Sequence, residues 1–208
     1  MKYRIPRFLY RGDNDHKNKR ELKNTLSYYQ LQSNLINGGV GREIIEKPLF
    51  DLINKHVDTG WSETHFLSFS ESEDIALRLG LHCELDKVVR NFMDYQEYFE
   101  NDKDWDFALI ALDTDKMSLV QVGQGVYEGF YSPSLKEFEF QLKYRIVLID
   151  VVRCLDNQKG YEEAKKNSER DREWLVLPAT VKQLNFGVEN SGILDGACIH
   201  EIKKYKRY

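Results

Sequence analysis

The sequence predicts a single α+β domain over residues 1–208. Two observations lead to this fold class. Apolar residues recur at helical spacing mainly in the N-terminal half, whereas most apolar runs of the second half have the length and composition of strands. Helices followed by strands, without regular alternation of the two, are typical of α+β proteins. A chain of 208 residues can bury one sizeable core, and no repeat or low-complexity linker divides it.

The net charge and the cysteines narrow the class of protein. A formal net charge of −4 weighs against a nucleic-acid binder, although a local groove can still be basic. The three cysteines (Cys83, Cys154 and Cys198) form no CxxC pair and suggest neither a disulfide framework nor a zinc site; the last two lie in apolar runs typical of a core. No segment resembles a signal peptide or a membrane span. We expect a cytoplasmic protein, although a module cut from a longer secreted chain would look the same.

The N-terminal half is predicted to begin with a strand and to continue with helices. The strand covers residues 8–13 and breaks at Gly12. Helical spacing follows over residues 20–37, where two glycines end the pattern, and again over residues 48–57, with Pro48 near the start. A further amphipathic helix is expected over residues 84–100, with an aromatic stripe that serves packing.

Between these helices, residues 64–80 predict a strand that passes directly into a helix. Residues 64–70 alternate, so Phe66 should face one side of the strand and Leu67 with Phe69 the other. Ser70 is the expected N-cap, acidic residues fill the first helical turn, and Gly80 is the expected stop. Hydroxyls at a strand edge beside a helix N-terminus can bind a polar or anionic ligand.

The second half is predicted to consist mainly of strands. They are expected over residues 107–112, 119–131, 138–152, 173–178 and 197–205. The polar stretch 157–170 is expected to be a loop or a short helix.

Three short motifs at the ends of predicted strands present an Arg, a Ser and a Glu in this order. They are Tyr10-Arg11-Gly12-Asp13, Ser68-Phe69-Ser70 and Asp171-Arg172-Glu173. The set resembles the ADP-ribosyltransferases of the Arg–Ser–Glu type, especially the bacterial toxin branch that includes the cholera and pertussis enzymatic subunits and the pierisins. A helix with Leu52-x-x-x-His56-Val57 before the central strand is similar as well. The resemblance implies an ADP-ribosyltransferase-like fold in which two mixed or antiparallel sheets cradle NAD.

The residue types suit the chemistry that the resemblance implies. ADP-ribose transfer breaks a glycosidic bond through an oxocarbenium-like transition state, which one nearby carboxylate stabilises. Glu173 would supply that carboxylate, Ser68 would hold it, and Arg11 would bind the pyrophosphate of NAD. Gly12 would let the backbone approach the nicotinamide amide, and Ser70 would brace the strand or the ribose. The implied catalytic residues are Glu173, Asp171 and Ser68; the implied NAD-binding residues are Arg11, Gly12, Asp13, Ser68 and Ser70; no metal is implied.

Three positions depart from the family pattern, the first being Asp15, which stands two residues after Asp13 where the family has an Arg. Phe69 stands where the family usually has Thr, but on a strand it points away from Ser68. Asp171 stands where the family has Gln or Glu, on the strand face expected to carry Glu173, where it could orient or deprotonate the acceptor. Because this position governs acceptor choice in the family, the acceptor stays open between a protein side chain and a nucleic acid. Basic residues between Lys165 and Arg172 are a faint signal for the latter.

Three functions are therefore weighed. The first is a mono-ADP-ribosyltransferase acting as an intracellular toxin or effector, which implies a neutralising antitoxin protein. The second is an NAD glycohydrolase that uses water at the same site, and the third is a non-catalytic module that binds a partner. His56 and His65 are interpreted as structural and Trp174 as core, whereas Trp61 or Tyr161 is a candidate for stacking on nicotinamide.

Overall fold

The computed structural model of the protein describes residues 4–14, 23–24, 42–59, 66–82, 95–97, 107–131, 145–179, 192–193 and 198–207. Within these ranges the chain is α+β, as predicted, and all pairings in its main sheet are antiparallel. The strands of that sheet, in spatial order, are β4 (Tyr95–Glu97), β11 (Ile199–Arg207), β5 (Phe107–Asp113), β1 (Phe8–Asn14), β3 (Leu67–Ser70), β9 (Glu173–Ala179), β8 (Arg145–Asp150), β7 (Val126–Tyr131) and β6 (Met117–Gly123).

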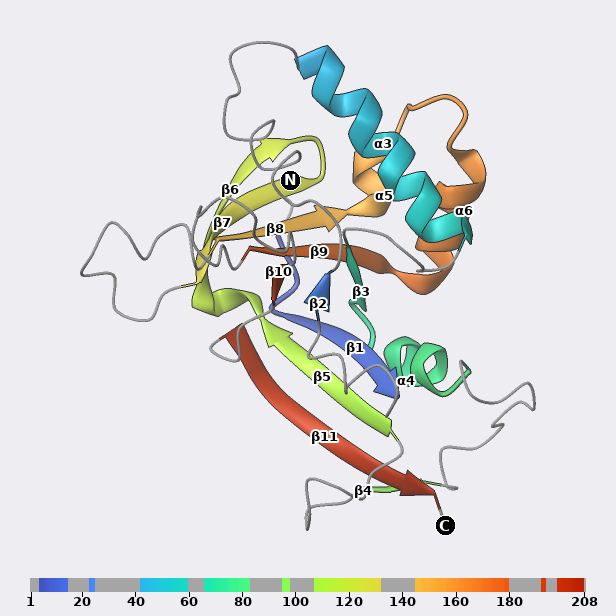
Figure 1. The fold of residues 1–208 in the computed structure, drawn as a ribbon, viewed down its shortest axis with the longest axis vertical. Helices are drawn as coiled ribbons and strands as arrows, with labels where there is room; N and C mark the ends of the chain where they lie inside the picture. The colour runs from blue at the N-terminus through green and yellow to red at the C-terminus, as the bar shows by residue number, and fades with distance from the viewer. Residues whose placement is uncertain are drawn as a thin grey trace, which may run out of the picture.

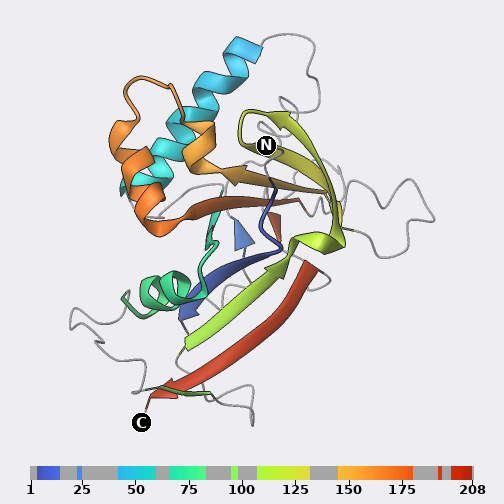
Figure 2. The ribbon, with the colours of Figure 1, turned by 180° about the vertical axis from the view of Figure 1, so that it is seen from behind.

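Two groups of strands meet at the middle of this sheet. Strands β11, β5 and β1 run together on one side, and β9, β8, β7 and β6 lie on the other (Figures 1 and 2). Strand β1 pairs with β5 along its whole length, but it pairs with β3 only through Tyr10 and Ser70. The structure thus differs from the expectation of two separate sheets, because this one residue pair joins the groups. We call this junction the seam.

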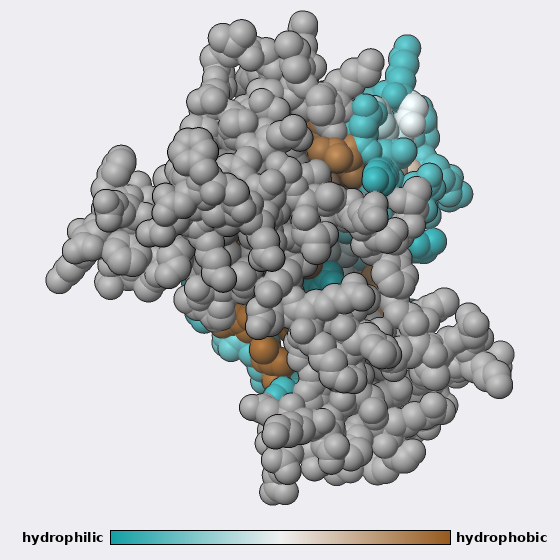
Figure 3. All heavy atoms as spheres, viewed as in Figure 1, coloured by the Kyte–Doolittle hydropathy of each residue, from teal (hydrophilic) through white to brown (hydrophobic). Residues whose placement is uncertain are grey.

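Three of the described helices cover one face of the β3–β6 side. Helices α3 (Arg42–Thr59), α5 (Val151–Cys154) and α6 (Glu162–Asp171) gather there, whereas α4 (Glu73–His82) lies against β1 (Figure 1). Figure 3 shows hydrophilic side chains gathered over the end where α3 and α6 lie. These helices therefore present a polar outer surface and pack their apolar side chains on the sheet. A separate two-stranded sheet pairs β2 (Lys23–Asn24) with β10 (Gly192–Ile193).

The alternation of side chains along the strands divides the core into two main clusters. Phe66 packs in the cluster beneath α3, α5 and α6, together with Ile53, Ile149 and Leu175. The second cluster, on the opposite face, contains Leu67, Phe69, Leu148 and Trp174. The predicted alternation around Phe66 is confirmed, because Phe66 and its neighbour Leu67 lie in different clusters. Cys154 and Cys198 are buried in these clusters, as expected.

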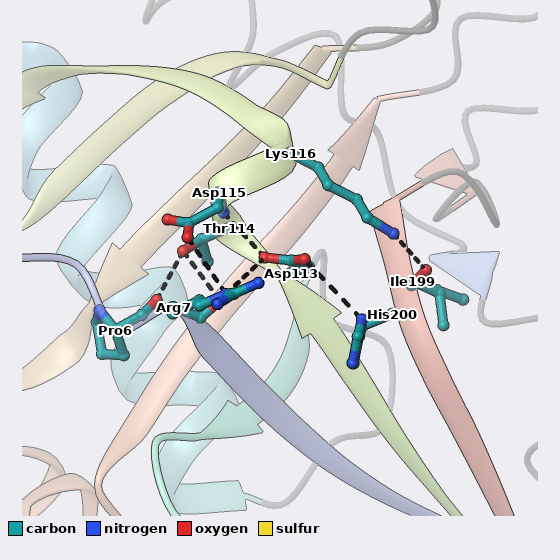
Figure 4. Close-up of polar contacts among 8 residues, drawn as sticks. All are labelled: Pro6, Arg7, Asp113, Thr114, Asp115, Lys116, Ile199 and His200. Atoms are coloured by element: carbon teal, nitrogen blue, oxygen red, sulfur yellow. Dashed lines mark hydrogen bonds and ion pairs between the residues drawn. The ribbon is translucent and has the colours of Figure 1, made fainter.

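A polar corner ties the start of β1 to the end of β5. The Thr114 hydroxyl, in the 3₁₀ turn η2 (Thr114–Lys116), donates to the carbonyl of Pro6 at 2.7 Å (Figure 4). The Arg7 guanidinium lies 3.2 Å from the Asp115 carboxylate and 3.8 Å from that of Asp113. The contacts tie β1 to β5, its antiparallel partner along its whole length.

Several sequence-based boundaries were wrong. Residues 23–24 and 95–97 are strand, where helices were predicted over 20–37 and 84–100, and the other residues of those two helices lie outside the described part. The helix predicted at 48–57 begins at Arg42, so Pro48 lies inside it. Strand β8 stops at Asp150, whose carboxylate accepts the Arg153 amide at 3.1 Å and begins α5. Of the four described helices, the two longer in total, α3 and α4, lie in the N-terminal half, and α5 and α6 lie in the C-terminal half.

None of the helices in the described ranges is both long and apolar enough to cross a lipid bilayer.

Candidate functional site

The site is built on the pairing of β3 with β9. Ser70 lies opposite Glu173 in this ladder, and Ser68 lies opposite Leu175. Residues opposite each other in an antiparallel pair share a face, as do residues two apart on one strand. The sheet therefore places Ser68, Ser70 and Glu173 on one face, the face that the α3 and α6 helices cover.

Arg11 contacts the backbone of β3 from the other side of the seam. Its Nη1 donates to the backbone carbonyl of Ser68 at 3.1 Å, although the two residues are 57 positions apart in the chain. Gly12 follows it in β1, opposite Leu109, and is partly exposed. Asp13 continues β1 opposite Ala108, but its side chain lies outside the described part of the chain.

Glu173 is held by two serines from different elements. The Ser168 hydroxyl, on α6, donates to Oε2 of Glu173 at 3.0 Å, and the Ser68 side chain lies within hydrogen-bonding reach of this carboxyl. The pKa of Glu173 is raised above its ordinary value, chiefly because the group is buried. The contacts of Ser68 and Ser168 with the carboxyl reduce this rise. The negative charge of Asp171 adds to the rise and the positive charge of Arg170 opposes it. The carboxyl group is thus desolvated but supplied with donors that favour its ionised form.

His56, which the sequence analysis interpreted as structural, contacts this group of residues through Ser68. The ring is 4% exposed, and its Nε2 lies 2.7 Å from Oγ of Ser68. Burial, followed by the positive charge of Arg11, lowers the pKa of His56 to about 4, so the ring is neutral at pH 7. When the Ser68 hydroxyl donates its one proton to an ionised Glu173, the neutral ring must be the donor at Nε2. The helix position of His56 before β3 was the only sequence signal; His65 lies outside the described residues.

Asp171 does not share a strand face with Glu173, contrary to prediction. It ends α6, and Arg172 then adopts a left-handed conformation with φ 46° and ψ 50° before β9 begins. The period of two cannot extend across this turn. The Asp171 carboxylate instead forms a bidentate pair with Arg170, at 2.8 and 2.7 Å.

Ser70 braces this turn instead of capping a helix. Its hydroxyl is buried and donates to the carbonyl of Asp171 at 2.8 Å. The cap position of α4 belongs to Ser72, whose Oγ accepts the Ile75 amide at 3.4 Å. The helix then continues through Gly80 to His82, so the predicted stop at Gly80 was also wrong.

The aromatic residues near the site serve packing among the described residues. Trp174 is 1% exposed and stacks on Tyr127, with ring centroids 5.8 Å apart, which confirms its place in the core. The Tyr161 hydroxyl donates to the Asp51 carboxylate at 2.6 Å and so joins α6 to α3. Trp61, the other candidate for stacking on nicotinamide, lies outside the described residues.

Ion pairs occupy part of the basic stretch of α6. Lys165 lies 2.7 Å from the Asp156 carboxylate and 3.9 Å from that of Glu169. Arg170 is paired with Asp171. In the described ranges no three His, Cys, Asp or Glu side chains are grouped as a metal ion would require.

Comparison of the chain with known proteins finds no matching family model, no matching curated protein and no matching solved structure.

Proposed function

We propose that the protein is a mono-ADP-ribosyltransferase that uses NAD as co-substrate. One observation carries the proposal: Arg11, Ser68 and Glu173 come from strands distant in sequence, yet Arg11 bonds the backbone of Ser68, and the Ser68 side chain lies within reach of the Glu173 carboxyl. The seam supports the finer proposal of an ADP-ribosyltransferase-like fold, because it divides the strands into two groups that would cradle NAD between them.

Each residue has a role in the proposed reaction. The bond between the ribose C1′ and the nicotinamide nitrogen breaks, and nicotinamide leaves as a neutral molecule with the electron pair of that bond. The ionised Glu173 stabilises the positive charge that develops on the ribose. Arg11 binds the pyrophosphate through charge-assisted hydrogen bonds. The acceptor atom then bonds to C1′ and gives up its proton to water.

Ser68 and His56 keep Glu173 ready for this role. A carboxylate that is desolvated acts more strongly on nearby charge than one in water. The same desolvation favours its protonated form, which is inactive in this mechanism. The Ser68 hydroxyl offsets that tendency, and the His56 ring fixes the direction in which this hydroxyl points.

The test is transfer of labelled ADP-ribose from NAD into cell extract by the wild type and by Glu173→Gln. A matched control is Glu169→Gln, which removes a solvent-facing carboxylate of α6. We expect label with the wild type and the control, and a loss of at least about 100-fold in Glu173→Gln. Extract treated beforehand with protease, DNase or RNase identifies the acceptor class by the treatment that removes the label.

Two other outcomes would contradict the transferase. Nicotinamide release without label would mean that water is the acceptor and the protein is an NAD glycohydrolase. No turnover of NAD by the wild type would leave a non-catalytic module that binds a partner. The proposal that the protein is an intracellular toxin with a neutralising antitoxin has its own test: the wild type should fail to express alone, whereas Glu173→Gln should express well.

A further inference from the structure

We propose that Ser168 is a positioning residue for the reaction. From α6 it hydrogen-bonds to the Glu173 carboxylate, which Ser68 approaches from β3. The inference rests on the proposed transferase function and adds to it a residue that none of the three sequence motifs contains. Its evidence is that the Ser168 hydroxyl is buried and hydrogen-bonds to Glu173.

The burial of Ser168 calls for an explanation. The residue is 0% exposed, in the last turn of α6, on the side that also buries Ala164 against the sheet. A serine is a poorer helix former than alanine, and a buried hydroxyl without a partner is costly. The hydrogen bond to Oε2 of Glu173 at 3.0 Å supplies that partner. The Ser168 hydroxyl thus occupies a buried position where an apolar side chain would normally pack. The group that it contacts is the candidate catalytic carboxylate of Glu173.

The turn between α6 and β9 keeps this contact in place. The Ser70 hydroxyl holds the carbonyl of Asp171 at 2.8 Å, and the amide of Glu71 donates to the carbonyl of Arg172 at 3.1 Å. These two hydrogen bonds tie the turn between α6 and β9 to the C-terminal end of β3. Ser168 therefore cannot shift along the helix axis without breaking the turn that leads directly to Glu173.

Two donors from different elements restrict the carboxylate more than one donor does. With Ser68 alone, rotation about the side-chain bonds of Glu173 would be limited on one side only. A small misplacement of a catalytic group can cost a factor of about 100 in rate. The two hydroxyls also favour the ionised form, so loss of Ser168 removes one of the contacts that lower the pKa of Glu173.

The experiment compares nicotinamide release over a range of pH for the wild type, Ser168→Ala and Ser168→Thr. Ser118→Ala, which removes an exposed hydroxyl on β6, is the control. In Ser168→Ala we expect kcat to fall about 10- to 100-fold, the range for a hydrogen bond to a charged group. KM for NAD should change less than about threefold, and the acidic limb of the kcat profile should move to higher pH. Ser168→Thr, which keeps the hydroxyl, should recover most of the rate.

A second measurement separates this inference from the proposed function. NMR titration of the Glu173 carboxyl carbon, assigned with Glu173→Gln, should give a higher pKa in Ser168→Ala than in the wild type. An unchanged pKa in a folded Ser168→Ala would overturn the inference, as would an unchanged kcat and acidic limb. If the wild type does not cleave NAD, the proposed function fails; a shifted pKa would then show that the contact is structural and has no part in a reaction.

Discussion

Nε2 of His56 lies 2.7 Å from the hydroxyl of Ser68, which in turn lies within hydrogen-bonding reach of Glu173. A neutral imidazole thus sits at the inner end of a short polar chain that leads to the candidate catalytic carboxylate. Its neutrality depends on burial and on Arg11, whose positive charge disfavours a second cation nearby. The arrangement has consequences for both stability and activity.

The titration of His56 predicts that the protein loses stability in mild acid. The unfolded chain protonates this histidine below about pH 6.5, whereas the native ring resists protonation until about pH 4. Its contribution to stability is therefore complete above pH 6.5 and falls by about 3 kcal/mol as the pH drops to 4. His56→Gln keeps a donor for Ser68 but does not titrate. The difference in free energy of unfolding between the wild type and this variant should therefore shrink by about 2 kcal/mol between pH 7.5 and pH 5. Urea unfolding at both pH values measures this gap, and a constant gap would contradict the prediction.

Arg11→Lys should weaken NAD binding more than it slows the chemical step. A lysine keeps the charge but not the planar fork that pairs with phosphate oxygens and with the Ser68 carbonyl. We expect KM for NAD to rise roughly tenfold with a smaller change in kcat, equivalent to about 1.4 kcal/mol of binding. Steady-state kinetics measure both constants. A selective fall in kcat would instead place Arg11 at the reacting atoms.

Arg172→Gly should stabilise the fold. Arg172 holds φ 46°, a conformation that costs a residue with a β carbon about 1 kcal/mol and costs glycine little. Its side chain is exposed, so little packing is lost. Urea unfolding should show a gain of about 1 kcal/mol, with a matching loss in Arg172→Val because a β-branched side chain fits this conformation poorly. Equal stability of the two variants would rule out strain at this turn.

Gly129→Ala should severely destabilise the β6–β7 hairpin. A β carbon at this position would overlap the backbone carbonyl of Ser118 on the neighbouring strand, which cannot move without breaking the ladder. We expect a loss of more than about 3 kcal/mol. Gly123→Ala is the control, because there the new carbon meets only Val126, at the ordinary contact distance of 3.5 Å. Thermal unfolding of both variants checks the difference.

Strand patterns in the sequence predicted much of the candidate site. Arg11, Ser68 and Glu173 lie in short segments with clear alternation or apolar runs, and the sheet brings these segments together. Asp171 was misplaced because the turn depends on Arg172 in a left-handed conformation, which its residue type does not favour. Local preference gave no sign of that turn.

His56 and Ser168 could not be assigned from sequence for a different reason. Both lie on helices, where a buried polar side chain looks the same in sequence whether it packs, caps or serves a site. Only the approach of α3 and α6 to the sheet, set by apolar packing far along the chain, brings them to Ser68 and Glu173. Apart from the Leu52-x-x-x-His56-Val57 motif, these tertiary contacts leave no spacing signal.

The seam at Tyr10 and Ser70 has a consequence for how the molecule is assembled over time. Although two groups of strands meet there through one residue pair, the chain alternates between them: β1 lies on one side, β3 on the other, β5 back with β1, β6 to β9 with β3, and β11 again beside β5. Neither group is a continuous stretch of polypeptide. A nascent chain still lacking β11 has only part of the first group, so the β11–β5–β1 side of the sheet can be completed only after β11 has been synthesised.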